Sequence, residues 1–347
     1  LVGSGFAAAL HMEAYKQVYG IEPWVAAVAS PSERAGDFAR EYGIPSVYRC
    51  MEEMIRKERP DVVDICSPPS LHAPMIGSAM GAGCHVICEK PLTGWFGDSA
   101  EPDMAKKVME QLEQLRRVVE RSGRKFFYAE NFIYAPAVQK SASLIRAAGE
   151  HILFMRGEES HSGSHAGHAA LWSMNGGGSL IRQGCHPLSA LLYLKQLENG
   201  KGAKAVGVTA DMGYIVPTLN EEERKNIQAR PKDVEDLANV ILTFEDGTKA
   251  LITAGDMILG GVRNEIQVYT TGGVYQCRIA PSDQMTTYHV EDEKLSGQYF
   301  TEKVETKKGW QSIFLCEDMA RGYVGELRDF LLCAAGRKGE PESGFSL

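Results

Sequence analysis

The stretch LVGSGFAAAL, residues 1–10, decides how the first part of the chain folds. Residues 3–8 match the pattern G-x-G-x-x-A, directly after a short apolar strand and at the start of an apolar helix. In this pattern Gly3 permits a tight turn, Gly5 lets a pyrophosphate approach the backbone, and the small Ala8 lets helix and strand pack closely. Free N–H groups at the helix start can then bind the phosphates. The stretch therefore predicts a dinucleotide-binding site.

The residues that follow alternate short apolar runs with amphipathic stretches. This alternation is typical of an α/β domain with a parallel sheet and helical crossovers. We predict a dinucleotide-binding domain over residues 1–130. Leu1-Val2 is too short for a central strand, so we expect the given sequence to start within its first element. Strands are expected at Leu1-Val2, 24–29, 62–66, 85–88 and 125–128.

After about residue 131 the pattern changes to consecutive strands. Asp246-Gly247, between two alternating runs, is a strong hairpin signal. We predict an α+β domain over residues 131–347, with a large open, mostly antiparallel sheet and helices on one side. Self-association is one way to cover such a sheet, so a homodimer or homotetramer is expected. The expected elements are a helix at 135–148 and strands at 151–157, 203–212, 237–247, 248–257, 264–271 and 274–279.

The composition excludes several classes of partner. The 347 residues are 44% hydrophobic and 24% charged, and the formal net charge of -8 argues against nucleic acid or an anionic membrane as main partner. No apolar run approaches the roughly 18 residues of a membrane span, and no basic leader of a signal peptide is seen. Eight scattered cysteines without a C-x-x-C pair favour free thiols in a reducing compartment. We therefore expect a cytoplasmic protein.

The end of the second expected strand bears on which dinucleotide is bound. Residues 27–34 read AVASPSER, with Ser30 where an acid would hold a ribose 2′-hydroxyl. Ser30, Ser32 and Arg34 could instead receive a 2′-phosphate, which favours NADP slightly over NAD. The alternative is that Ser32 caps the next helix and Arg34 is a surface residue.

Two further expected strands end in polar or proline-rich turns. They are Ser67-Pro68-Pro69 and Glu89-Lys90-Pro91. Ligands of an open parallel sheet bind beyond the carboxyl ends of its strands. Because neither Lys nor Pro belongs inside a central strand, the second strand must end here. Lys90 is therefore expected beside a bound nicotinamide.

Four motifs in this order resemble the Gfo/Idh/MocA oxidoreductases. They are Gly3-x-Gly5-x-x-Ala8, Ser67-Pro68-Pro69-x-x-His72, Glu89-Lys90-Pro91, and Gly176-Gly177-Gly178 followed by His186. The resemblance implies a Rossmann domain, a second domain with a large open sheet, and sugar, polyol or related substrates. It implies that Lys90 is the catalytic lysine and His186 the acid/base. It also implies cofactor contacts from Gly3, Gly5, Phe6, Ser30, Arg34, Ser67, Pro68, His72 and Glu89, next to Lys90.

The chemistry that follows is oxidation of an alcohol. A hydride leaves the carbon for the nicotinamide, and the protein must orient the alcohol and take the proton from its oxygen. His186 can accept that proton, and Lys90 can donate to the same oxygen. We predict an NAD(P)-dependent dehydrogenase acting on CH-OH groups of a sugar, sugar acid or polyol. The alternatives are glycoside cleavage or elimination with tightly bound NAD and no net redox change, or a catalytically silent sugar or cofactor sensor.

Arg182 departs from the pattern of the family. Relatives commonly keep an acid four residues before the histidine, and here that position holds Arg182. Arg182 can bind a carboxylate or phosphate of the substrate as a bidentate clamp. Alternatively it is structural, paired with Glu158, Glu159 or a backbone carbonyl.

A loop with three histidines precedes the glycine run. His161, His165 and His168 invite a zinc hypothesis, but residues 162–164 (SGS) make the helix that would align them improbable, and no metal is predicted. In relatives this loop borders the substrate pocket. We expect His161, His165 and Trp172, together with Asn131, Lys90, Arg182 and His186, to contact substrate. The charged run at 220–236 is expected to be a solvated loop or helix rather than a site.

Overall fold

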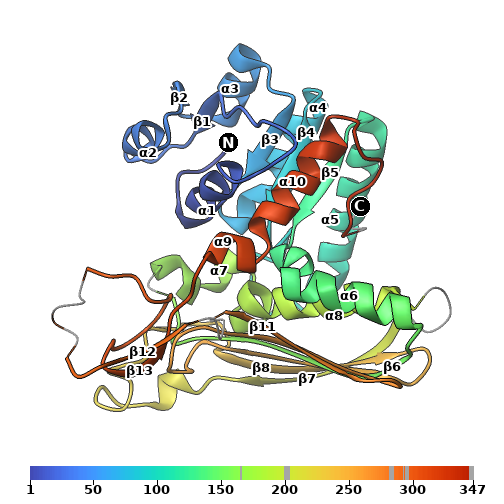
Figure 1. Ribbon diagram of the computed structural model, residues 1–347. Helices are drawn as coiled ribbons and strands as arrows, with labels where there is room; N and C mark the ends of the chain where they lie inside the picture. Colours follow the sequence, from blue (N-terminus) through green and yellow to red (C-terminus); the bar gives the residue numbers. More distant parts are fainter. Residues whose placement is uncertain (165, 199–203, 281–284, 292, 294–296, 344–347) are drawn as a thin grey trace. The chain divides into compact units, whose positions relative to one another are not determined.

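A computed structural model describes residues 1–164, 166–198, 204–280, 285–291, 293 and 297–343 (Figure 1). The chain divides into two compact units. Unit 1 comprises Leu1–Glu130 together with the segment that begins at Tyr323, and unit 2 comprises Asn131–Gly322. The expected boundary after residue 130 coincides with this division. The expected extension of the second domain to residue 347 is wrong, because the segment from Tyr323 onward belongs to unit 1.

Unit 1 is a doubly wound parallel sheet. Val2 forms parallel bridges to both Ala29 and Ile65, so the first residues lie between β1 and β3. The strand order is β2-β1-Val2-β3-β4-β5, the order of a Rossmann fold. Strand β2 was not predicted, since its three residues carry too little pattern. The strands are β1 (Ala27–Ala29), β2 (Ser46–Tyr48), β3 (Val62–Ile65), β4 (His85–Glu89) and β5 (Phe126–Ala129).

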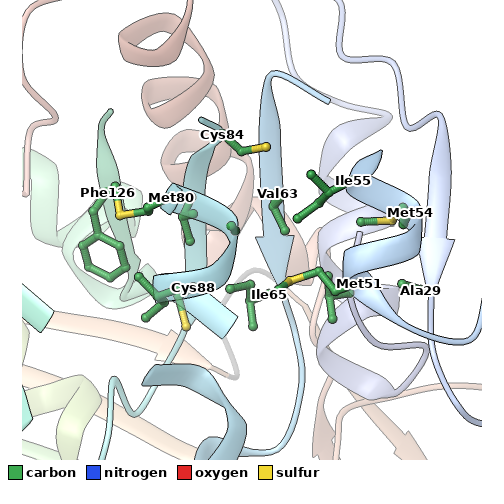
Figure 2. Close-up of a cluster of buried hydrophobic side chains, with 14 of the residues drawn as sticks. Ala29, Met51, Met54, Ile55, Val63, Ile65, Met80, Cys84, Cys88 and Phe126 are labelled. Atoms are coloured by element: carbon green, nitrogen blue, oxygen red, sulfur yellow. The ribbon is translucent and has the colours of Figure 1, made fainter. Parts of the chain in front are cut away.

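Helices cover the sheet of unit 1 and enclose its core. Figure 2 shows Met51, Met54 and Ile55 of one helix meeting Val63 and Ile65 of β3. Removing such side chains from water drives the packing, at about 25 cal/mol per Å² of apolar surface. The helices are α1 (Phe6–Tyr15), α2 (Ala35–Tyr42), α3 (Met51–Glu58), η1 (Pro69–Leu71), α4 (His72–Gly81), α5 (Met104–Ser122) and α10 (Tyr323–Ala334).

Helix α10 belongs to unit 1 because it packs against α1. The ring of Phe330 stacks on that of Phe127 in β5, with centroids 5.0 Å apart. Arg328 Nε donates to the Tyr19 carbonyl at 2.9 Å, just beyond α1. A sequence reading from the amino end could not place α10, since these contacts join residues about 200 to 300 positions apart.

Unit 2 is a six-stranded sheet in the order β11-β10-β6-β9-β8-β7. All neighbouring pairs are antiparallel except β6 with β9, so the prediction of a mostly antiparallel sheet is confirmed. The strands are β6 (Ile152–Ser160), β7 (Ala205–Gly213), β8 (Leu237–Phe244), β9 (Lys249–Gly255), β10 (Arg263–Thr270) and β11 (Val274–Ala280), with a separate hairpin of β12 (Thr286–His289) and β13 (Gly309–Ser312).

One face of this sheet is covered and the other is open. Figure 1 shows α6 and α8 along one face. Strand register places Phe154 opposite both Tyr269 and Lys249, and Leu251 opposite Ile241, on the other face. The remaining elements are η2 (Asn131–Tyr134), α6 (Pro136–Ala148), η3 (Gly167–Ala170), α7 (Trp172–Asn175), η4 (Leu180–Gly184, a π-helix), α8 (Cys185–Gln196), η5 (Val216–Thr218) and α9 (Glu317–Ala320).

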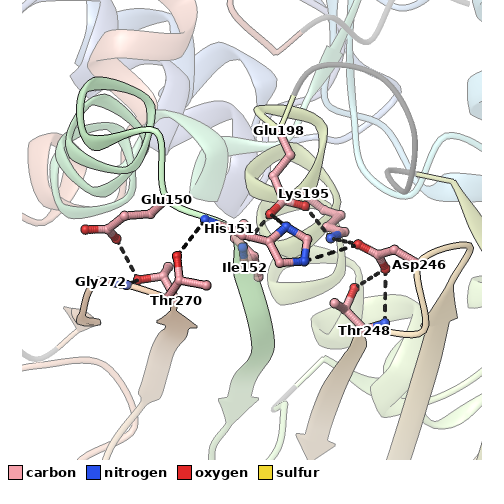
Figure 3. A network of polar contacts seen from close by, with 10 residues as sticks. Glu150, His151, Ile152, Lys195, Glu198, Asp246, Thr248, Thr270 and Gly272 are labelled. Carbon is pink, nitrogen blue, oxygen red and sulfur yellow. Dashed lines mark hydrogen bonds and ion pairs between the residues drawn. The ribbon is translucent and has the colours of Figure 1, made fainter.

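A buried lysine in the last turn of α8 binds carboxylates at the end of that helix and in the β8–β9 turn (Figure 3). Lys195 is fully buried, and its ammonium donates to carboxylates of Glu198 and Asp246, the latter at 2.7 Å. His151, just before β6, lies 2.8 Å from the same Glu198 carboxylate. Burial alone would raise the pKa of Asp246, but hydrogen bonds from Lys195 and Thr248 outweigh it and lower that pKa. The network therefore stays charged and joins α8, β6 and the β8–β9 turn.

Two expectations about the whole chain can be compared with the structure. All eight cysteines are free thiols, as predicted, although Cys50 and Cys316 are exposed. Among the described residues, no helix has the length and apolar character that crossing a membrane requires.

Candidate functional site

The glycine turn of unit 1 has the geometry that dinucleotide binding needs. Gly3 has φ +104°, and a Cβ there would lie 2.4 Å from the Cys66 carbonyl oxygen. A Cβ on Gly5 would meet nothing within 4 Å, so the start of α1 faces open space. Phe6 is exposed there, whereas Ala8 is fully buried against the strand. The unsatisfied N–H groups of the first turn of α1 can therefore receive phosphate oxygens.

The end of β1 carries Ser30 in a small hydroxyl network. Its Oγ accepts a hydrogen bond from Ser4 Oγ at 3.0 Å and one from the Ser32 N–H at 3.3 Å. Arg34 is exposed at the start of α2. Ser32 Oγ accepts the Arg34 N–H at 3.2 Å in the turn before α2, but Arg34 and not Ser32 stands at the N-cap of that helix. No acid follows β1 at this point.

His72 joins the ends of β3 and β4. Its side chain is fully buried, with Nδ1 2.7 Å from the Pro91 carbonyl and Nε2 2.9 Å from the Ser67 carbonyl. Both ring nitrogens are thus engaged with backbone. The side chain of His72 holds the two turns that follow the strands, and the expected cofactor contact stays a prediction. Ser67 and Pro68 themselves lie partly or fully exposed at this edge.

Glu89 also points inward. One carboxylate oxygen accepts the Lys90 N–H at 2.9 Å, and the other lies 3.2 Å from His11 Nε2. The side chain is buried, and the expected cofactor contact from Glu89 stays a prediction. Glu89 fixes the backbone of Lys90, which follows β4 directly and is half-buried at the carboxyl edge of the sheet.

His11 is the residue of this unit that sequence reasoning missed. It is fully buried in α1, with Nδ1 2.8 Å from Asp64 Oδ2 while Nε2 faces Glu89. Only an imidazolium donates from both nitrogens. Burial alone would lower the pKa of His11, but the charge of Asp64 outweighs it and raises that pKa well above its usual value. A histidine and a tyrosine (Tyr15) four residues apart in an otherwise apolar helix were the available signal.

A further buried carboxyl lies in this cluster. Glu326 of α10 is fully buried, and burial raises its pKa well above the usual value, with the carboxylates of Glu89 and Glu130 adding to the effect. His11 itself lies between Asp64 and Glu89, which ties α1, β3 and β4 together behind the cofactor edge.

In unit 2 the glycine run at residues 176–178 packs against Glu235 and binds its carboxylate. The Glu235 carboxylate accepts the N–H groups of Gly178 at 2.7 Å and Leu180 at 3.0 Å. A Cβ on Gly178 would lie only 1.8 Å from the Glu235 carbonyl oxygen, and Gly177 has φ +153°. Glycines are required at these positions, and Glu235 caps the segment that leads into α8.

Arg182 has a partner that the sequence did not predict. It lies in the π-helix η4, and its NH1 is 2.7 Å from Oδ2 of Asp256, the residue after β9. The other Asp256 oxygen accepts from Gln183 Nε2. Asp256 was not among the partners predicted for Arg182, which were Glu158, Glu159 or a backbone carbonyl. The contact supports the structural alternative for Arg182.

His186 is buried at the start of α8. Its ring stacks on Phe132 of η2, with centroids 4.9 Å apart and an interplanar angle of 21°. Asn131 is buried too, and its amide donates to the Arg321 carbonyl at 2.9 Å. This bond gives Asn131 a structural role, and the expected substrate contact stays a prediction.

The described histidines of the histidine-rich loop, His161 and His168, do not form a cluster. His161 is buried, its Nδ1 accepts the Gly163 N–H at 2.9 Å, and burial lowers its pKa to about 4. His168 is exposed, and His165 lies outside the described residues. The indole N–H of Trp172 is buried and unpartnered within the described part of the chain. In that part, His161 and His168 do not belong to a set of three candidate metal ligands.

The pocket next to this loop has a volume of about 390 Å³ and lies wholly within unit 2. Arg182 and Asp256 line this pocket. Lys225, Gln228 and Arg230, from the segment at 220–236, line it as well. Residues 220–228 of this segment are exposed or partly exposed, as expected of a solvated loop, but the segment also lines this pocket.

Comparisons with known proteins agree with these two units. A family model described as "Oxidoreductase family, NAD-binding Rossmann fold" (GFO/IDH/MocA) matches residues 1–121, and the model of the GFO/IDH/MocA C-terminal domain matches residues 151–276. D-apiose dehydrogenase of Paraburkholderia graminis is 29% identical over 146 residues, 42% of this chain and 35% of that protein. Trans-1,2-dihydrobenzene-1,2-diol dehydrogenase of Mus musculus is 25% identical over 252 residues, 73% of this chain and 65% of that protein. The matches thus span about a third to two thirds of these curated relatives.

Solved structures share the fold over nearly the whole chain. GenD2 from gentamicin A biosynthesis, in complex with NAD, has a TM-score of 0.79 at 21% identity and covers 98% of this chain and 87% of its own. Levoglucosan dehydrogenase, in complex with NADH and levoglucosan, has a TM-score of 0.71 at 19% identity and covers 99% and 91%.

The ion pairs of His11 predict a pH-dependent contribution to stability. Replacing His11 by Leu leaves Asp64 and Glu89 buried without a counter-charge, which should cost about 3 kcal/mol of unfolding free energy at pH 6. Because the folded-state pKa of His11 is raised, this contribution is complete below the unfolded pKa near 6.5 and is lost as pH rises through the raised value. Urea unfolding of both proteins from pH 6 to 10 measures it.

The matched control is Tyr15→Phe, which removes a hydroxyl bound to Asp64 but no charge. Its cost should be about 1 kcal/mol and the same at pH 6 and pH 8. A difference between wild type and His11→Leu that stays constant or grows toward alkaline pH would contradict a protonated His11.

Proposed function

Because the chain belongs to the Gfo/Idh/MocA oxidoreductase family, we propose that it is an NAD(P)-dependent dehydrogenase of a sugar, sugar acid or polyol. The observation that carries the proposal is the fixed position of Lys90. Its backbone is held by Glu89 at the carboxyl edge of the parallel sheet, the edge at which the glycine turn also lies. The names of the relatives, sugar and diol dehydrogenases, support the same class of reaction.

The residues at this edge fit a dinucleotide. Gly3 and Gly5 leave the start of α1 bare of side chains, and Phe6, Ser67 and Pro68 border it. We assign the pyrophosphate to the N–H groups of α1. When bound, the nicotinamide supplies the hydride acceptor of an alcohol oxidation.

Two side chains handle the proton of the alcohol in this proposal. Lys90 donates a hydrogen bond to the reacting oxygen and stabilises its developing negative charge. His186 takes the proton from that oxygen as general base. The stacked Phe132 ring fixes the plane of the imidazole, so the accepting nitrogen keeps one orientation.

Replacement of either residue tests these roles. Lys90→Met and His186→Ala should each lower kcat by about 100-fold or more, the usual contribution of a positioned acid or base. Cofactor affinity, measured by fluorescence titration, should stay within about threefold because neither change touches the glycine turn. Wild-type turnover in either variant would remove that residue from the mechanism. An unaltered thermal unfolding midpoint is the control for folding.

Arg34 carries the preference for NADP in this proposal. It is exposed where the sheet edge lacks the acid that binds a ribose 2′-hydroxyl, and a guanidinium there can pair with a 2′-phosphate. Ser30 is occupied by Ser4 and Ser32, so it contributes less.

Arg34→Ala should raise KM for NADP+ about tenfold and change KM for NAD+ less than about twofold, as expected for loss of one charged hydrogen bond. Arg34→Lys is the matched control and should retain most of the NADP+ affinity, because the positive charge remains. Equal effects of Arg34→Ala on both cofactors would refute the assignment.

The open face of the unit 2 sheet is proposed as the self-association surface. Phe154 and Ile241 are exposed on it, and Phe154 stacks on Tyr269 at 5.8 Å. Charges of both signs border this apolar strip: register places Glu158 beside Glu265, and Glu265 beside Arg278. A second copy related by a two-fold axis can therefore pair acid with base while burying the apolar strip.

Phe154→Glu should raise the dimer dissociation constant about 100-fold or more, since it buries an unpaired charge. Leu144→Glu, at an exposed apolar position of α6, is the matched control and should have no effect. Light scattering after size exclusion measures both. A wild-type monomer at every concentration, or a Phe154→Glu dimer as tight as wild type, would contradict the proposed surface.

A further inference from the structure

The pocket of unit 2 is well formed, although its walls come from two loops. The Ser162 carbonyl accepts the N–H groups of Gln228 at 2.6 Å and Ala229 at 3.0 Å. Gly163 has φ +108°, and a Cβ there would lie 2.2 Å from the Ala229 nitrogen. The segment that carries Lys225 and Arg230 is therefore held directly against the histidine-rich loop.

The charge at the floor of this pocket is already balanced. Arg182 and Asp256 form a buried ion pair at 2.7 Å, and Gln183 occupies the second oxygen of Asp256. The floor thus presents a neutral pair of strong hydrogen-bonding groups, suited to hydroxyl groups. Gln228 adds a buried carbonyl oxygen that has no partner in the described part of the chain.

The wall has a surplus of positive charge. Lys225 and Arg230 both line the pocket, whereas Asp256 is the one acid among the described lining residues. Arg230 donates to backbone carbonyls of its own loop, those of Ile227 and Ala229, and pairs with no carboxylate among the described residues. Lys225 pairs with Glu222, but both side chains are exposed. Ion pairs between exposed side chains contribute little to stability.

From this arrangement we infer that the pocket binds a monosaccharide that bears an anionic group, a carboxylate or a phosphate. Lys225 and Arg230 bind the anion, and the Arg182–Asp256 pair with Gln228 binds hydroxyl groups. The volume of about 390 Å³ lies within the range of about 300–1,000 Å³ typical of small-ligand pockets. In this inference the anion is bound by the loop at 225–230 and not by Arg182, for which an anion-binding role was considered in the sequence analysis.

This inference rests on the proposed function, because it narrows the substrate of the same enzyme to its anionic members. The pocket floor and His186 lie on one continuous helical segment, with Arg182 in η4 and His186 in the first turn of α8. A ligand on Arg182 is therefore bound by the segment that carries the proposed base.

Calorimetric titration of the whole protein with D-glucuronate, D-glucose 6-phosphate and D-glucose tests the inference. At least one of the two acids should bind about tenfold or more tightly than D-glucose, the effect of one or two charged hydrogen bonds. Which acid binds more tightly distinguishes a carboxylate from a phosphate.

The double variant Lys225→Gln/Arg230→Gln should lose about tenfold of the affinity for the acids and change that for D-glucose less than about twofold. Lys140→Gln, which removes an exposed charge from α6 outside the pocket, is the matched control and should change neither. Equal affinity for acids and D-glucose, no binding of either acid, or an unaffected double variant would overturn the inference.

Oxidation of the same sugars, followed with NAD+ and NADP+, separates this inference from the proposed function. Oxidation of D-glucose without preferential binding of the acids supports a dehydrogenase and overturns the anion pocket. Tight binding of an acid that depends on Lys225 and Arg230, without oxidation of any sugar, supports the pocket and counts against the dehydrogenase.

Discussion

The buried contact of His11 with Asp64 and Glu89 is the interaction on which the carboxyl edge of the unit 1 sheet depends. Three elements end or begin at that edge, and each contributes one member: α1 holds His11, β3 holds Asp64, and β4 ends in Glu89. Because Glu89 also accepts the Lys90 N–H, the position of the lysine backbone follows from a charge enclosed in the core. Buried ion pairs of this kind are costly to break once formed, which makes the edge rigid.

An ion pair also joins distant elements of unit 2. Arg182 of η4 contacts Asp256, the residue after β9, and Gln183 donates to the other Asp256 oxygen. The two charges balance each other at the floor of the pocket. In the inference drawn above, the specificity of the pocket therefore depends on the loop at 225–230.

Local patterns in the sequence predicted the fold well, because each depends on neighbours along the chain. The glycine turn, the parallel sheet of unit 1 and the mostly antiparallel sheet of unit 2 are confirmed. Contacts between distant segments were not predictable: α10 on α1, Asp256 on Arg182, and Ser162 on Gln228 each join residues whose separation leaves no periodic signal. The contacts of His72 and Glu89, for which cofactor contacts were expected, also join distant segments and were not predictable. Their motif placed them at the correct edge, but only the structure shows that their side chains turn inward.

In the proposed function, a hydride leaves a sugar carbon for the nicotinamide. The most direct measurement is transfer of label from a sugar deuterated at every ring carbon, with the reduced cofactor examined by NMR. Deuterium at carbon 4 of the reduced nicotinamide, in amounts equal to the oxidised product, is the predicted result. Turnover of the sugar without label in the released cofactor, or with label lost to water, would contradict net oxidation and favour a redox-neutral cleavage or elimination.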